Sequence, residues 1–183
     1  MWFLGFRENS VLFAQNHAVH SDTLTDTSKA IAPRYGTATA LIDSLENRLT
    51  TAKDDTNKVR ILSNLSFYIR DKSSYKALQY ARQCLSLAKQ LKYKWGIAKA
   101  LYRIGEAHRT QGNYDKALNY YLKSRRIQEE SRNKEGIALC LWGIAVIYES
   151  QGAYKKALKY HLKCKKIYEE LDQKLNTGIL LGS

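Results

Sequence analysis

The sequence contains almost no proline, the residue that helix interiors tolerate least. Pro33 is the one proline in 183 residues, whereas average usage would give roughly 9 in a chain of this length. None occurs from Arg34 to Ser183. Such a chain can form one helix after another without an enforced break, and 44% hydrophobic residues suffice for a packed core.

Other absences exclude whole classes of protein. No stretch approaches the ~20 apolar residues of a membrane span, and three cysteines without a C-x2-C pair indicate neither a disulfide scaffold nor a zinc site. No Ser/His/Asp arrangement, glycine-rich phosphate loop or dense carboxylate pair is present. His17, His20 and Asp22 are close in sequence, but they lie in a polar segment where we expect no metal. The sequence therefore predicts no enzyme, no catalytic residue, no metal and no cofactor.

Residues 1–35 read as a degraded signal peptide followed by a linker. Apolar residues from Trp2 to Phe6 and from Val11 to Ala14 are interrupted by four polar ones, whereas a signal peptide has an unbroken apolar run of about 7–15 residues. Two interpretations stay open. An export signal would place the protein in the periplasm or outside the cell, and a weakly packed tail would leave it in the cytoplasm.

Acidic residues are scarce in the second part of the chain. The net charge is +13, with 5 basic and 7 acidic residues up to Asn57, and therefore 25 basic and 10 acidic residues beyond it. Lys156, Lys159, Lys163 and Lys166 recur at the spacing of one helical face. Such a stripe attracts anions, but we expect no aromatic residue in it for base stacking. We interpret it as a solvated face and do not expect nucleic acid as the partner.

A period of 40 residues is the strongest signal in the sequence. Leu101 begins LYRIGEAHRTQGNYDKALNYYLKSRRIQEE, Leu141 begins LWGIAVIYESQGAYKKALKYHLKCKKIYEE, and a more divergent copy begins at Ile61. Each copy has apolar residues at helical spacing, then a turn, which is a glycine in two copies (Gly112 and Gly152), and then a second helical pattern. The repeated unit is therefore predicted to be a pair of helices.

These units resemble tetratricopeptide repeats, whose pattern is W-x2-L-G-x2-Y, then A-x3-F, then P. The matching residues are Leu101, Ile104, Gly105, His108, Gly112, Tyr114, Ala117 and Tyr121 in one copy, and Leu141, Ile144, Ala145, Tyr148, Gly152, Tyr154, Ala157 and His161 in the next. The closing proline is absent. The resemblance implies an all-α fold, a right-handed α-solenoid of helix-turn-helix repeats. Forty-residue versions are similar to those of bacterial regulators that precede a histidine kinase or a DNA-binding domain.

We expect four segments along the chain. Residues 1–35 carry the degraded signal and linker, 36–56 a leading helix, 57–175 three repeats, and 176–183 the start of a truncated fourth repeat. Because repeat arrays need capped ends to stay soluble, we expect the chain to be a fragment of a longer protein.

The resemblance also implies where a partner binds, since tetratricopeptide arrays hold peptides in the concave groove lined by their first helices. Aromatic and arginine side chains carry much of the energy of interfaces. The residues predicted to line the groove are Arg60, Phe67, Arg70, Lys99, Tyr102, Glu106, Arg109, Trp142, Val146 and Glu149. An alternative is that Tyr102 and Trp142 only pack inside the protein and do not contact a ligand. The lysine and asparagine set of chaperone-binding members is absent.

The predicted function is that of a protein- or peptide-binding scaffold with an acidic or amphipathic partner. The alternative is a sensory or regulatory segment of a longer signalling protein, either a histidine kinase or a transcriptional regulator. The residue types of a groove restrict the partner without naming it.

Overall fold

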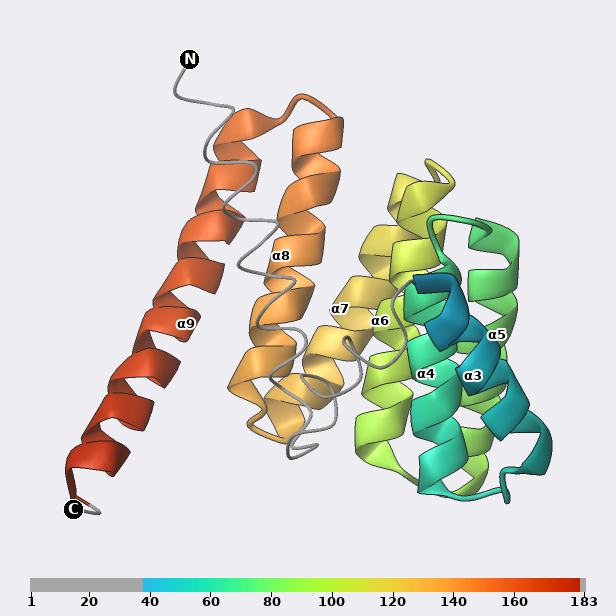
Figure 1. Cartoon of the computed structure of the whole chain (residues 1–183). Helices are drawn as coiled ribbons and strands as arrows, with labels where there is room; N and C mark the ends of the chain where they lie inside the picture. Colours follow the sequence, from blue (N-terminus) through green and yellow to red (C-terminus); the bar gives the residue numbers. More distant parts are fainter. Residues whose placement is uncertain (1–37, 182–183) are drawn as a thin grey trace. The chain divides into compact units, whose positions relative to one another are not determined.

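A computed structural model describes residues 38–181 of the chain, with side chains up to residue 172 (Figure 1). The helices in this range are α3 (Ala38–Thr51), α4 (Thr56–Ile69), α5 (Ser74–Gln90), α6 (Lys94–Thr110), α7 (Tyr114–Glu130), α8 (Lys134–Ser150) and α9 (Tyr154–Leu181). No strand occurs among the described residues. The predicted signal peptide and linker, with His17, His20 and Asp22, lie outside them.

Short polar side chains begin several of the helices. The Asp55 carboxylate accepts hydrogen bonds from the backbone N–H groups of Asn57 and Lys58, at 2.8 and 3.1 Å. Ser73 caps α5 through the N–H of Lys76 at 3.2 Å, and Asn133 caps α8 through the N–H of Gly136 at 3.1 Å. Each cap satisfies a donor that the first helical turn leaves unpaired.

Left-handed residues end the helices. Gly112 and Gly152 have φ of 73° and 72°, and Lys92 and Arg132 have φ of 52° and 54°. After α6, the N–H of Asn113 bonds the carbonyl of His108 at 2.9 Å, which is the longer hydrogen bond of a Schellman motif. The turn predicted at Gly112 is therefore present.

The helices of residues 42–183, which form one compact unit, pack in sequence order. Each helix from α4 to α9 contacts the next one, and in addition α4 contacts α6 and α6 contacts α8. The second helices α5, α7 and α9 make no comparable contacts with one another in the described structure. Ala77, Ala117 and Ala157 are all buried at equivalent positions, where the two helices of a repeat approach most closely. This is the all-α solenoid of helix-turn-helix repeats that the sequence predicts.

The last helix differs from the expected boundaries. The repeat alignment places a new first helix at residue 176, but α9 runs without a break from Tyr154 to Leu181. The equivalent turns after α5 and α7 are made by Lys92 and Arg132 without glycine or proline, whereas α9 continues through the equivalent residue Asp172. The preceding first helices also carry a glycine at their third residue, Gly96 and Gly136, whereas the corresponding residue here is Asn176. No described helix is both long and apolar enough to cross a membrane.

Candidate binding surface on the first helices

Helices α4, α6 and α8 lie side by side and carry the residues predicted to bind a partner. Seven of these residues keep accessible surface, and we call them the first-helix face. They are Arg60, Phe67, Arg70, Arg109, Trp142 and Val146, which are half-buried, and Glu149, which is exposed. They come from all three first helices.

The other three predicted residues, Lys99, Tyr102 and Glu106, are buried in the middle of the surface. All three belong to α6, which is flanked by α4 on one side and α8 on the other. The Tyr102 ring packs on the Tyr121 ring with a centroid distance of 5.3 Å. The packing alternative therefore describes Tyr102. It describes Trp142 in part, because that side chain packs against the buried cluster of the last repeat.

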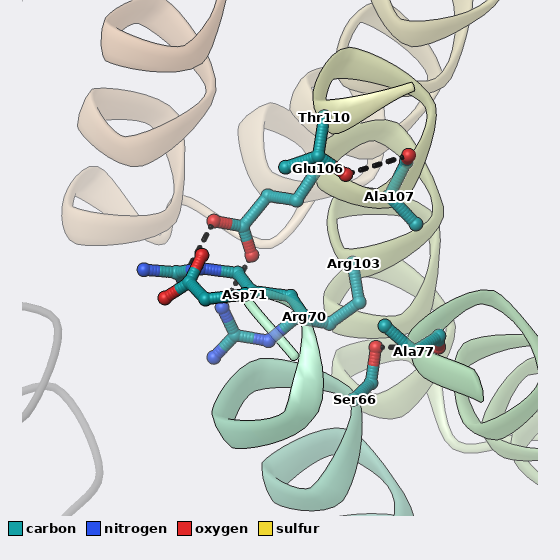
Figure 2. Close-up of polar contacts among 8 residues, drawn as sticks. All are labelled: Ser66, Arg70, Asp71, Ala77, Arg103, Glu106, Ala107 and Thr110. Atoms are coloured by element: carbon teal, nitrogen blue, oxygen red, sulfur yellow. Dashed lines mark hydrogen bonds and ion pairs between the residues drawn. The ribbon is translucent and has the colours of Figure 1, made fainter. Parts of the chain in front are cut away.

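Glu106 of α6 pairs with two arginines, Arg70 at the end of α4 and Arg103 on its own helix, and the first of these pairs links the two helices (Figure 2). One carboxylate oxygen accepts from Arg70 at 3.2 Å and the other from Arg103 at 2.6 Å. The side chain of Glu106 is only 5% exposed. Burial by itself would raise the pKa of Glu106, but the charges of Arg103 and Arg70 outweigh it and hold that pKa below the ordinary value of 4.5. Glu106 is therefore an anion inside the array.

Both arginines also pack against the ring of Phe67. The guanidinium carbons of Arg70 and Arg103 lie 4.2 and 4.5 Å from the ring centroid. Cation–π contacts of this kind orient a guanidinium as well as attract it. The side chain of Arg70 stays 16% exposed beside Asp71, whose carboxylate lies 3.5 Å away. Arg70 is thus fixed by one buried anion and one aromatic ring, with an edge open to solvent.

Cations outnumber anions around Glu106. Arg70, Arg103 and Arg109 all act on this one carboxylate, and Lys99 is buried on the same helix with its ammonium 5.4 Å from the Trp95 ring centroid. Burial would lower the pKa of Arg109, but the neighbouring Tyr121 and Glu106 raise it above its ordinary value. The central part of the surface therefore carries an excess of positive charge.

The Tyr121 ring sets the spacing between the central helices. A Cβ atom added at Gly105 of α6 would lie 2.8 Å from this ring, and one added at Gly143 of α8 would also lie 2.8 Å from it. Tyr121 is fully buried, which raises the pKa of its hydroxyl. Glycine on both sides lets the ring fill the space between two successive first helices. The sequence pattern identifies Gly105 but not its counterpart Gly143.

Sequence reasoning missed the aromatic rings beneath the lysine stripe, and the expectation that the stripe contains none is wrong. Lys123 lies 5.7 Å from the Tyr120 ring centroid, and Lys163 lies 5.6 Å from that of Tyr160. These rings stack on His108 and Tyr148, each with a centroid distance of 5.5 Å. Since one ring face meets another ring and a lysine lies over the ring as well, the tyrosines are not free platforms for bases. The spacing of three from Tyr120 to Lys123, repeated from Tyr160 to Lys163, was the available signal in the sequence.

The cysteines are structural thiols, as their positions predict. Cys84, Cys140 and Cys164 are free and buried, and burial raises the pKa of each thiol to about 12. Cys84 and Cys164 donate to the carbonyls of Val59 and Ala138 at 3.3 Å, as the Ser124 hydroxyl does to Ala98 at 2.8 Å. Among the described residues, no three His, Cys, Asp or Glu side chains are placed to hold a metal ion.

Solved structures with similar folds include two that cover most of this chain. One is the Rap protein in complex with competence and sporulation factor, with 22% sequence identity, a TM-score of 0.61 and coverage of 72% of this chain. The other is BtubC (BKLC) from P. vanneervenii, with 14% identity, a TM-score of 0.64 and coverage of 92% of this chain. The chain spans 38% of the length of the Rap protein and 75% of that of BtubC. A comparison with curated protein sequences gave no match.

The sequence also matches the profile of the tetratricopeptide repeat over residues 58–129 and again over residues 96–170. The two overlapping matches together span more than half of the chain and coincide with helices α4 to α9. The chain therefore belongs to the tetratricopeptide repeat family, a family of protein-interaction scaffolds.

Proposed function

We propose that the chain holds an acidic, amphipathic segment of another protein on its first-helix face. The observation that carries this proposal is the excess of positive charge around Glu106, at the centre of a surface with half-buried aromatic and apolar side chains on either side. Arginine favours carboxylate ligands because its planar fork forms two parallel hydrogen bonds. A partner with Asp or Glu side chains fits this surface.

The proposed affinity for the partner depends on side chains that are already ordered before binding. Arg70 is already held by Glu106 and by the ring of Phe67, so a partner carboxylate meets a guanidinium that loses little conformational freedom on binding. Arg109 offers a second half-buried guanidinium on the neighbouring helix. Trp142 and Val146 on α8 then supply the apolar contact that an amphipathic ligand needs.

The similarity to the Rap protein supports a binding role, since that protein was solved in complex with competence and sporulation factor. A second candidate function, a regulatory segment of a longer signalling protein, is favoured by the length relation, because the chain spans 38% of the Rap protein. In that case the same face is the input site, and ligand binding changes the activity of another domain.

A displayed peptide library selected on the immobilised chain tests this proposal. We expect selected peptides to be rich in Asp and Glu with interspersed apolar residues, and to bind less tightly as salt is added. Trp142→Ala is expected to weaken binding of the best peptide by about 2 kcal/mol or more. Tyr75→Ala removes an aromatic ring that is 68% exposed on α5 and is expected to leave the affinity unchanged.

Melting curves of all variants serve as controls, since Trp142 also packs on the last repeat. Lys159→Glu, on the lysine stripe, is expected to change mainly the association rate and its salt dependence. The proposal fails if Lys159→Glu abolishes peptide binding while Trp142→Ala retains it, because the lysine stripe is then the binding site.

A further inference from the structure

The second helices carry most of the positive charge of the chain. Residues 76–86, 116–126 and 156–166, which are equivalent in the three repeats, contain two, four and five basic residues and no acidic one. They account for most of the net charge of +13. Among the described helices, first helices contact one another but second helices do not to a comparable extent, so these segments lie on the outer side of the array. We call the exposed side chains of residues 116–126 and 156–166 the outer basic face.

This side of a second helix stays open even where another repeat follows. Lys156 and Lys163 of α9 are exposed, and so are the equivalent residues Lys116 and Lys123 of α7, although α7 packs against the following first helix, α8. Lys76 of α5, one more repeat earlier, is exposed as well, and α6 packs against that helix. A further first helix packed against α9 in the same way would therefore leave the outer basic face accessible.

Two exposed leucines lie among these basic residues at equivalent positions. Leu122 of α7 and Leu162 of α9 are 43% and 57% exposed, and Leu122 is exposed although α8 packs beside it. Leu162 has a lysine three residues before it and lysines three and four residues after it, and Leu122 has arginines three and four residues after it. Residues at these spacings are neighbours on a helix surface. Each leucine is therefore surrounded by cations, a combination typical of helices that lie in a membrane interface.

The leucines and the kind of cation distinguish between possible anionic partners. Single-stranded nucleic acid stacks on free aromatic rings, whereas Tyr120 and Tyr160 are covered by lysines and by other rings. The backbone of a duplex offers phosphates but no apolar surface to the leucines. Individual carboxylates of a protein favour the planar fork of arginine, but the basic residues of 156–166 are all lysines. An anionic bilayer offers a continuous negative potential and an apolar layer beneath it.

We propose that the outer basic face binds the surface of a bilayer that contains anionic phospholipids. Leu122 and Leu162 enter the headgroup layer, and the lysines around them lie beside lipid phosphates. Clusters of about 4–8 basic residues on an amphipathic helix are typical of this kind of binding. The contact is peripheral and uses the second helices, so it leaves the first-helix face available to a partner protein and does not depend on the function proposed for that face.

Cosedimentation of the full chain with lipid vesicles tests this proposal. At low salt, we expect vesicles of phosphatidylcholine mixed with phosphatidylglycerol to bind the chain at least tenfold more strongly than phosphatidylcholine alone, and added salt to reverse this preference. K159E/K166E, which reverses two exposed charges beside Leu162, is expected to weaken binding at least tenfold. K53E/K94E is the matched control, because it changes the net charge equally at exposed residues outside the second helices, and it is expected to weaken binding less than threefold.

Further variants test the role of the leucines and the independence of the two surfaces. L122Q/L162Q is expected to weaken vesicle binding at least fivefold, whereas Leu91→Gln, 38% exposed at the end of α5, and Trp142→Ala on the first-helix face are each expected to change it less than twofold. Equal losses for K53E/K94E and K159E/K166E would overturn the proposal, since binding would then follow net charge alone. A DNA duplex that binds more tightly than the vesicles, with an affinity unchanged in L122Q/L162Q, would also overturn it and assign the face to nucleic acid.

Discussion

The contact of Tyr121 with two glycines leads to a prediction in which one substitution has opposite signs in two backgrounds. Gly105→Ala places a Cβ atom 2.8 Å from Cδ1 and Cε1 of Tyr121, well inside the ~3.5–4.0 Å of normal carbon contacts. The ring has no room to retreat, because its opposite edge (Cδ2, Cε2 and Cζ) lies against Gly143. The substitution is therefore expected to strain the wild-type array, although alanine is the better helix former.

The structure gives the magnitude of each effect. Overpacking a tight core costs about 1–3 kcal/mol, and the trapped ring places this site towards the upper end. Replacing a helical glycine by alanine stabilises the helix by about 1 kcal/mol through its higher helix propensity. The net effect of Gly105→Ala on the wild type is therefore expected to be a destabilisation of about 1–2 kcal/mol. Tyr121→Ala is expected to cost about 3–5 kcal/mol, as other large aromatic truncations do in cores. With the ring removed, Gly105→Ala is expected to stabilise by about 1 kcal/mol.

Urea denaturation followed by circular dichroism at 222 nm measures all four members of this double-mutant cycle. The expected coupling energy between residues 105 and 121 is about 2–3 kcal/mol. Gly112→Ala is the matched control, since its Cβ meets nothing within 4 Å and its φ of +73° alone imposes a cost. That cost, about 1 kcal/mol, should be equal with and without Tyr121. If Gly105→Ala destabilised the protein both with and without Tyr121, the explanation that the Tyr121 ring is held tightly between the two glycines would be refuted.

Three further predictions follow from single residues. Glu106→Gln leaves two arginines without their anion and should destabilise the protein by about 3–5 kcal/mol at pH 7. Because the folded-state pKa of Glu106 is lowered, the stabilisation from its carboxylate is present above pH 4.5 and is lost as the pH falls below that value. The variant should therefore lose this part of the pH dependence when unfolding is measured across an acid titration. Arg132→Gly should stabilise by about 1 kcal/mol in the same urea assay, since residue 132 has a φ of 54° that costs a side-chain-bearing residue this much. Thiol titration of the unfolded chain should count three cysteines, whereas at pH 8 the native thiols, with pKa values of about 12, should react far more slowly; fast native reaction would contradict their burial.

Periodicity was enough to predict the fold. Helix pairs in a repeat are defined by local signals, such as the spacing of Leu101 and Ile104 and the turn at Gly112, and each unit contacts mainly its neighbours. Such local signals predict the helix boundaries correctly wherever the following repeat packs a first helix against the second helix. They do not account for the length of α9, which continues through residue 172, where the equivalent residues Lys92 and Arg132 form turns.

The candidate surface was only partly predictable. Register places residues on the first helices, but it treats Arg70 and Glu106 alike, although one has an open edge and the other lies between two arginines. The difference arises because α6 packs against two first helices, α4 and α8, whereas within the described residues α4 and α8 each pack against one, α6. Arg103 was not a candidate, since its buried pairing with Glu106 depends on the ring of Phe67 from another repeat.

Comparison of the repeats supports treating Gly105 and Tyr121 as one structural unit. The equivalent pair is Leu65 and Ala81 in the first repeat and Ala145 and His161 in the third. The large first-helix residue Leu65 is thus paired with the small second-helix residue Ala81, and the smallest first-helix residue, Gly105, is paired with the large ring of Tyr121. Leu65, Ala81 and Tyr121 are all fully buried. Because interiors are packed to nearly constant density, a change of size on one helix must be met on the other. The size of residue 105 is therefore decided by contact with residue 121, which is why a packing role accounts for both without any part in ligand binding.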